Sequence, residues 1–332
     1  MRGFTLFFYS SILRSCILWA SACTALALTA GCASVEPIAE RPASVLQAER
    51  AAAARNFVPA ALHGAQRVEL TVTEPGSPLA ATVFAWLFEP QGGALSRGAV
   101  VALHGCGGLY NAKGELTARH RSGAEQLVAL GFIVLMPDSF GSRGAREICT
   151  TPYTKRSINI ALRRVDAFAA LNYLAGRSDV DAARIALLGW SNGATTTLAS
   201  IDRLFRQPGQ HPIKASFSRA IAFYPGCGEA LQQRLTPAVP VLLLLGAEDN
   251  WTPARLCEQW AESLRGSEQP HIEIEIFAGA HHGFDDPGSR LVRRTDVATS
   301  PTGAGVIIGG HPEARRRSWE RVHQWLAPLQ QP

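Results

Sequence analysis

The chain has 332 residues, of which 47% are hydrophobic and 18% are charged, and its formal net charge is +5. This composition is typical of a folded globular protein and excludes a fibrous or intrinsically disordered chain. The densest basic run is residues 315–317, which fall on an expected terminal helix without interleaved aromatic residues. We interpret this run as a solvated helix face and expect no nucleic-acid partner.

The first 31 residues have the features of an export signal. Arg2 and Arg14 are their only charged residues, and the apolar stretch that follows is too short for a membrane-spanning helix. Residues 28–32 (LTAGC) resemble the lipobox of bacterial lipoproteins, which implies cleavage before Cys32 and a lipid anchor on that cysteine. The alternative is ordinary secretory cleavage nearby. Both interpretations place the mature chain on the periplasmic or extracellular side of a bacterial membrane.

The remainder is expected to comprise a tether over residues 32–65 and a single catalytic domain over residues 66–330. Within that domain, strand-like and helix-like segments alternate, which predicts an α/β fold with a mostly parallel sheet of about eight strands and helices on both faces. The expected strands are 68–72, 81–88, 99–103, 132–136, 184–188, 220–224, 241–245 and 272–277. The expected helices are 118–130, about 158–175, 194–204, one after Pro253, and one from Pro312 to Pro328.

Two of these helices have a clear apolar face at helical spacing. The face of the helix after residue 158 comprises Ile158, Leu162, Val165 and Ala169. The face of the last helix comprises Trp319, Val322, Trp325 and Leu326.

Residues 189–193 (GWSNG) match the pattern G-x-S-x-G between an expected strand and an expected helix. A sharp turn there strains the central residue, and glycines two positions away on each side remove side chains that would clash. Ser191 would then stand exposed above the sheet, beside the Asn192 N–H and the positive end of a helix dipole. The pattern favours Ser191 as a nucleophile over a turn that holds an incidental serine.

An acid and a base are expected after later strands. Residues 241–245 lead to Asp249, with Glu248 as the competing carboxylate. The last strand leads to His281 and His282, and spacing alone does not choose between these two bases. The histidine pair has no third ligand at a useful spacing, so we expect no metal and no cofactor.

A second backbone donor for an oxyanion is expected after the strand at 99–103, where residues 103–108 read LHGCGG. Glycines let the backbone approach a substrate oxygen closely. We assign the two oxyanion donors to the N–H groups of Cys106 and Asn192, with Gly105 as the alternative to Cys106. His104 is interpreted as a residue that fixes this loop.

The order serine, acid, histidine is that of α/β-hydrolases, and the chain resembles the dienelactone hydrolase family over most of residues 65–328. The resemblance is carried by five segments, namely 104–108, 136–141, 189–193, 246–253 and 279–284. It selects Asp249 over Glu248, and His282, which precedes Gly-Phe, over His281. It implies a serine hydrolase that cleaves a small carboxylic ester through an acyl-enzyme, without a cofactor.

The sequence departs from the family at two places. The founding enzymes have cysteine where this chain has Ser191, and they hold a substrate carboxylate with an arginine near the position where this chain has Asp285 and Asp286. Because two acidic residues would repel a carboxylate, we expect a different ester. Candidate substrate contacts are the side chains of Arg143, Arg146, Trp190 and Trp251, although solvation at the surface is an alternative role for both arginines.

Four cysteines remain after the expected signal and anchor, and they allow three pairings. All four are expected on loops or a helix start at the catalytic edge of the sheet. The oxidising environment outside the cytoplasm permits disulfides. We hypothesise the pairs Cys106–Cys149 and Cys227–Cys257. The mature chain is expected to be a monomer. Two other functions stay open on the same fold, a peptidase for short peptides and a non-catalytic binding lipoprotein.

Overall fold

The computed structural model describes residues 39–40, 64–75, 80–92, 96–204, 215–266 and 271–330. These residues belong to one compact unit, Ile38–Pro332. Cys32 and most of the expected signal and tether lie outside the described residues. Among the helices of the described ranges, none combines the length and the apolar character needed to cross a membrane.

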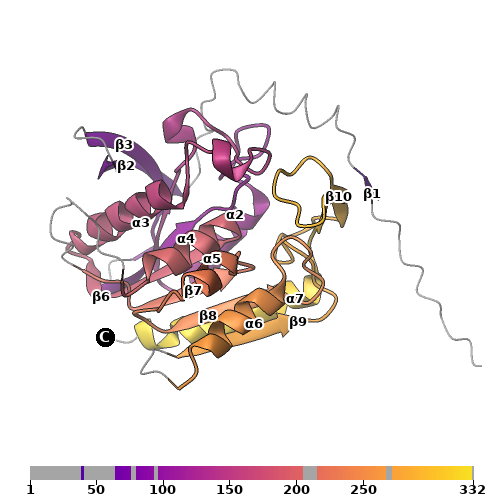
Figure 1. Ribbon diagram of the computed structural model, residues 1–332. Helices are drawn as coiled ribbons and strands as arrows, with labels where there is room; N and C mark the ends of the chain where they lie inside the picture. Colours follow the sequence, from indigo (N-terminus) through magenta and orange to yellow (C-terminus); the bar gives the residue numbers. More distant parts are fainter. Residues whose placement is uncertain are drawn as a thin grey trace, which may run out of the picture. The chain divides into compact units, whose positions relative to one another are not determined.

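An eight-stranded sheet forms the centre of this unit, in the order β2-β3-β5-β4-β6-β7-β8-β9. The sheet is antiparallel only where β3 pairs with β2 and β5, and all other neighbours are parallel (Figure 1). The predicted α/β fold is thereby confirmed. The strands are β2 (Ala65–Thr73), β3 (Ala80–Phe88), β4 (Arg97–Leu103), β5 (Ile133–Pro137), β6 (Val180–Trp190), β7 (Arg219–Phe223), β8 (Val241–Gly246) and β9 (Ile272–Phe277).

The central strands have the sequences expected of strands covered on both sides. Every residue of β5 and β8 is buried, whereas β2, at one edge of the sheet, alternates between buried and exposed residues. Continuous apolar runs such as the LLLL of β8 suit a parallel sheet between two layers of helices. Alternation suits an edge strand with one solvated face.

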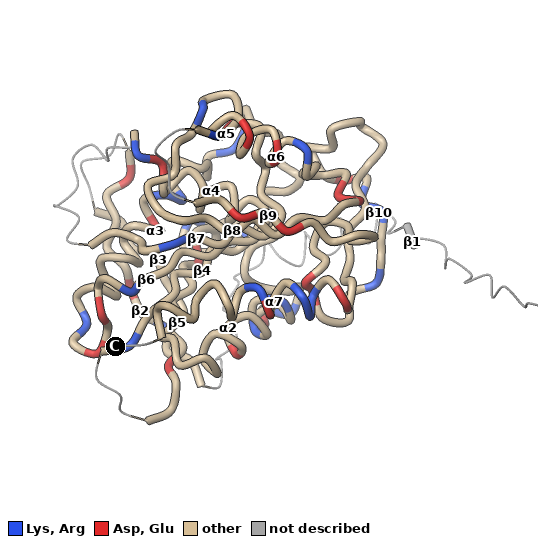
Figure 2. The backbone as a smooth tube through the Cα atoms, turned by 90° about the horizontal axis from the view of Figure 1, so that it is seen from below, with Lys and Arg blue, Asp and Glu red and all other residues tan. Residues whose placement is uncertain are grey.

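Helices cover the two faces of the sheet, with α2 and α7 on one face and α4, α5 and α6 on the other (Figure 2). α3 packs with α4 and therefore lies on the second face. The helices are α2 (Ala118–Ala129), α3 (Ile160–Ala175), α4 (Asn192–Ser200), α5 (Gly228–Gln232), α6 (Ala254–Ser263) and α7 (Pro312–Leu326). Within the described ranges, short 3-10 turns occupy Gly141–Arg143, Tyr153–Lys155 and Ala327–Leu329.

The helix starts follow from local chemistry. The Thr117 and Asn159 side chains accept a hydrogen bond from a first-turn backbone N–H in α2 and α3, respectively. In α7 the His311 side chain accepts from the Ala314 N–H, and Pro312 occupies the first turn, where its missing N–H has no cost. The predicted inner face of α7 is confirmed, since all four of its residues are buried.

The inner face of α3 differs from the prediction. Leu162 and Ala169 are only half-buried, whereas Arg163 and Asp166 are fully buried. The apolar pattern misplaced this face because two charged residues of the helix find partners inside the protein, as described below.

The segment between β9 and α7, for which the sequence analysis predicts no element, contains two strands. These are β10 (Val292–Arg294) and β11 (Val306–Ile308), which form a small sheet with β1 (Ala39–Glu40) in the order β1-β10-β11. Val297 and Val306 belong to a separate apolar cluster with Cys106, Cys149 and Phe140. This segment therefore packs against the loops at the carboxyl ends of the strands.

Candidate active site

Ser191 lies at the sharp turn between β6 and α4. Its backbone has φ 53° and ψ −118°, a conformation that costs a non-glycine residue about 1–3 kcal/mol. A Cβ on Gly193 would lie 2.1 Å from the Leu103 carbonyl oxygen, and one on Gly189 would lie 2.4 Å from the Gly193 carbonyl oxygen. Gly193 is therefore required for the close approach of the turn to the end of β4, and Gly189 for the tightness of the turn itself, as the sequence pattern predicts.

The structure brings together the three residues that the sequence nominates. The Ser191 Oγ lies 2.9 Å from the His282 Nε2, and the His282 Nδ1 lies 2.8 Å from the Asp249 Oδ2. All three are at least nine-tenths buried, whereas Glu248, the competing carboxylate, is exposed. The structure places His282, not His281, between the hydroxyl and the carboxylate.

The carboxylate of Asp249 is contacted by three donors besides the His282 Nδ1. Its Oδ1 accepts from the backbone N–H groups of Trp251 and Thr252, both at 2.8 Å, and its Oδ2 lies 2.9 Å from the Thr252 hydroxyl. Burial alone would raise the pKa of Asp249, but the attraction and hydrogen bond of His282 and these backbone donors outweigh it. The pKa of Asp249 therefore lies below its ordinary value, and the group is ionised at neutral pH.

A buried polar network lies under the His282 ring. Asp285 is 1% exposed and accepts from the Trp190 Nε1 at 2.8 Å and the Tyr224 hydroxyl at 2.5 Å, and Arg119 lies 3.3 Å away. The Tyr224 ring packs against His282 with 4.6 Å between centroids. The loop that carries His282 is thus anchored to the core.

This network corrects two sequence expectations. Trp190 is fully buried beneath the sheet edge, so its assignment as a substrate contact is wrong. Asp285 does not repel a substrate carboxylate from an open site, because its charge is buried and compensated by Arg119. Asp286 also pairs with Arg119, at 3.2 Å.

The loop after β4 lies against the serine turn. A Cβ on Gly105 would lie 3.4 Å from the Ser191 Cβ, which brings the neighbouring Cys106 N–H to the side of the nucleophile. Within the described ranges, neither the Cys106 N–H nor the Asn192 N–H donates to another protein group. His104 is fully buried, with its Nδ1 2.8 Å from the Gly105 carbonyl oxygen, so it lies in the loop as a fixing residue.

The other predicted substrate contacts have different outcomes. The assignment of Arg143 is wrong, because its guanidinium donates to Asp166 at 2.8 and 3.0 Å and to Glu74 at 2.7 Å and is only 12% exposed. Arg146 donates to the Asn111 carbonyl and stays a prediction. Trp251 is half-buried beside the site, with its ring centroid 4.7 Å from that of His282 and its Nε1 donating to the Thr299 hydroxyl.

Both hypothesised disulfides are confirmed. Cys106 bonds to Cys149 and Cys227 bonds to Cys257. The first joins the loop after β4 to the long loop after β5, and the second joins the start of α5 to α6.

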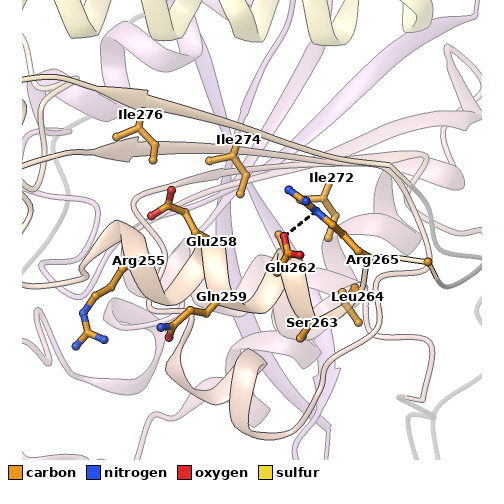
Figure 3. Close-up of a pocket in the computed structure, with 12 residues that line it drawn as sticks. Arg255, Glu258, Gln259, Glu262, Ser263, Leu264, Arg265, Ile272, Ile274 and Ile276 are labelled. Carbon is orange, nitrogen blue, oxygen red and sulfur yellow. Dashed lines mark ion pairs between the residues drawn. The ribbon is translucent and has the colours of Figure 1, made fainter.

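Two further features of the described ranges bear on function. No group of three or more His, Cys, Asp or Glu side chains is placed there to bind a metal ion. A pocket lies between α6 and β9, where Ile272, Ile274 and Ile276 point toward the helix (Figure 3). None of its lining residues belongs to the Ser191–His282–Asp249 arrangement.

Sequence reasoning missed two residues that support this arrangement. Thr252 contacts both Asp249 and His282, and the spacing of three residues after an aspartate could have suggested it. Arg163 donates to the Asn192 side chain and the His104 carbonyl. Its signal is a charged residue one turn before Asp166 in a mostly apolar helix.

The eight-stranded sheet and the strained serine turn at the end of β6 define a hydrolase of the α/β-hydrolase fold. A family model agrees with this class. It matches residues 84–330, and the chain belongs to the dienelactone hydrolase family. A search of curated proteins found no match.

Solved structures share this fold at low sequence identity. A putative dienelactone hydrolase from Klebsiella pneumoniae is 18% identical with a TM-score of 0.56, over 80% of this chain and 99% of its own. Thermogutta terrifontis esterase 2, phosphorylated by paraoxon, is 17% identical with a TM-score of 0.59, over 81% and 95%. A dienelactone hydrolase-like promiscuous phosphotriesterase from metagenomic libraries is 19% identical with a TM-score of 0.55, over 80% and 99%.

Proposed function

We propose that this chain cleaves a small carboxylic ester with Ser191 as nucleophile, His282 as general base and acid, and Asp249 as the group that orients and stabilises the imidazole. The observation that carries the proposal is the continuous contact from the Ser191 hydroxyl through both His282 nitrogens to an ionised carboxylate. Family membership supports the reaction class.

The chemical steps follow from this geometry. The Ser191 Oγ attacks the ester carbonyl while its proton moves to the His282 Nε2, and the Asp249 carboxylate stabilises the resulting imidazolium. The N–H groups of Cys106 and Asn192 receive the oxyanion. The imidazolium then protonates the leaving alcohol. Water, deprotonated by His282, attacks the acyl-enzyme and releases the acid and the free Ser191 hydroxyl.

The nature of the ester follows from the surroundings of His282. Trp251 packs on the imidazole, and Ile308 of β11 is paired with His282 through an isolated bridge. Arg143, a candidate anchor for a substrate carboxylate, already forms ion pairs with Asp166 and Glu74. We therefore propose an ester with an apolar group, in place of a dienelactone carboxylate, as the preferred substrate.

A test compares the parent with Ser191→Ala and His282→Gln on p-nitrophenyl esters of acetate, butyrate and octanoate. We expect each variant to lose kcat by about 10³-fold or more, because neither attack nor proton transfer can then proceed. Correct folding is checked by circular dichroism and thermal unfolding. Turnover by Ser191→Ala at the parental rate would exclude this mechanism and favour a binding role for the chain.

We also propose that the chain is exported, lipidated on Cys32 and held as a monomer at the periplasmic or extracellular face of a bacterial membrane. The lipobox-like sequence supports the anchor, and two disulfides suit an oxidising compartment. Metabolic labelling with an alkyne fatty acid should mark the parent and not Cys32→Ser. Equal labelling of both would exclude Cys32 as the anchor.

A further inference from the structure

The two N–H groups proposed for the oxyanion come from separate loops. Cys106 follows β4 and Asn192 follows β6, so their relative position depends on contacts between the two loops. An oxyanion hole works only if both donors point to one place before the reaction begins. A displacement of about 1 Å can cost roughly 10²-fold in rate.

One guanidinium connects these two loops. The Arg163 Nη1 donates to the Asn192 Oδ1 at 2.5 Å, and the Nη2 donates to the His104 carbonyl oxygen at 2.5 Å. Asn192 carries one proposed donor itself, and His104 lies two residues before Cys106, which carries the other. The planar, rigid geometry of the guanidinium fixes the angle between its two bonds.

Arg163 is held in this position from α3. Its side chain is fully buried, and the Phe140 ring lies 5.0 Å from the guanidinium carbon. Burial lowers the pKa of Arg163 to about 9, so the group remains charged at neutral pH. The buried Asp166 on the next turn supplies a compensating negative charge, although it bonds directly to Arg143.

Burial of this cation is unfavourable for stability in itself. An apolar residue of similar size would fill the space without the desolvation cost, and replacement of buried ion pairs by such residues is often neutral or stabilising. The Arg163 Nε has no acceptor within the described ranges, so the guanidinium is not fully compensated. An apolar residue could not form the hydrogen bonds from Arg163 to Asn192 and to the His104 carbonyl.

We propose that Arg163 is a positioning residue that holds the Cys106 and Asn192 N–H groups in one geometry for the oxyanion. It acts through the His104 carbonyl and the Asn192 side chain and contacts no reacting atom. This inference rests on the proposed function. It predicts a defect confined to the transition state, with little change in the binding of the ester itself.

The test compares Arg163→Met with a matched control, Arg219→Met. Arg219 is a half-buried arginine at the opposite end of the sheet, where it donates to the Trp325 carbonyl and packs on the Trp325 ring. Steady-state kinetics with p-nitrophenyl butyrate are measured together with inhibition by a trifluoromethyl ketone, whose serine adduct places an oxyanion between the same donors.

For Arg163→Met we expect kcat to fall about 10–100-fold with KM changed less than about 3-fold. The affinity for the trifluoromethyl ketone should fall by a similar factor. Arg219→Met should keep kcat and inhibitor affinity within about 2-fold of the parent. A parental kcat in folded Arg163→Met, or equal losses in both variants, would overturn the proposal.

Asn192→Ala keeps the test decisive if Arg163→Met does not fold. It removes one acceptor of Arg163 at a half-buried position and leaves the backbone N–H in place. We expect kcat and inhibitor affinity to fall about 3–10-fold, less than in Arg163→Met, because the bond from Arg163 to the His104 carbonyl remains. Parental values for Asn192→Ala would overturn the proposal, while inactivity of Ser191→Ala would show that the proposed function itself still holds.

Discussion

At the scale of single residues, the orientation of His282 depends on more than its bond to Asp249. The Thr252 hydroxyl lies 2.9 Å from the Asp249 Oδ2, 3.1 Å from the His282 Nδ1 and 3.0 Å from the Tyr224 carbonyl oxygen. This single hydroxyl therefore contacts the loop of Asp249, the loop of His282 and the residue that follows β7.

Thr252→Val removes that hydroxyl and keeps the shape of the side chain. The backbone N–H groups of residues 251 and 252 still bind the Asp249 Oδ1, so the carboxylate stays in place. Loss of one hydrogen bond worth about 1 kcal/mol should lower kcat about 3–10-fold with KM unchanged.

The control for this variant is Thr236→Val, whose hydroxyl donates to the Arg234 carbonyl away from the site. It should behave as the parent. A Thr252→Val enzyme with parental kcat would show that the backbone donors alone orient the carboxylate.

The proposed site could be predicted from the sequence only where a residue belongs to a local motif. Ser191 lies between two glycines in the G-x-S-x-G pattern. Asp249 and His282 each follow a strand that the sequence predicts. Thr252 contacts Asp249 locally, but its contact with His282 spans 30 positions and the contact of Arg163 with Asn192 spans 29. No local pattern encodes these two longer contacts. Trp190 and Arg143 were wrongly predicted as substrate contacts for the same reason. Each side chain binds a buried carboxylate that is distant in sequence, Asp285 and Asp166, respectively.

At the scale of elements, the carboxyl ends of β4, β6, β8 and β9 each supply one part of the site. Parallel strands make this convergence automatic, which explains why the long central strands and the site edge were predictable. β10, β11 and α5 were not predicted, because each spans only three to five residues and their short sequences carry no clear period. These short elements depend on packing against the loops around them.

The Cys106–Cys149 disulfide acts at this scale. It closes 43 residues and ties the proposed oxyanion loop to the loop after β5, whereas Cys227–Cys257 closes 30 residues around α5 and α6. The chain-entropy model gives both about 4 kcal/mol of stability. Cys149→Ala and Cys257→Ala should therefore lower the free energy of unfolding by similar amounts.

Their activities should differ. Loss of the first disulfide frees the loop of Cys106, and we expect kcat to fall about 10-fold in Cys149→Ala with little change in Cys257→Ala. Urea unfolding and ester kinetics measure the two effects separately. Equal kcat losses in the two variants would indicate that the disulfides act only through stability.

At the scale of the whole molecule, buried histidines make the fold sensitive to acid. His120, in the first turn of α2, is 2% exposed and its ring contacts that of Trp190. Burial, reinforced by Arg119, lowers the pKa of His120 to about 3. Below pH 6.5 the unfolded chain binds a proton at His120 that the folded chain does not bind. Stability therefore falls as the pH drops from about 6.5 toward 3.

The size of this effect can be measured. From pH 7 to pH 5, His120 alone should reduce the free energy of unfolding by about 2 kcal/mol. His120→Gln removes this titration, so its free energy of unfolding should fall by about 2 kcal/mol less than that of the parent between pH 7 and pH 5. Urea unfolding at pH 7, 6 and 5 tests the difference, and parallel pH dependences in the two proteins would contradict it.

The central claim is that the Ser191 hydroxyl is made nucleophilic by His282. Intact-mass analysis after exposure to a fluorophosphonate tests it most directly, because the reagent bonds covalently only to an activated hydroxyl. The account predicts one adduct per chain, mapped to Ser191 by peptide sequencing, with none in Ser191→Ala and labelling slowed at least about 100-fold in His282→Gln. An unlabelled parent, or an adduct at another residue that persists in Ser191→Ala, would contradict it.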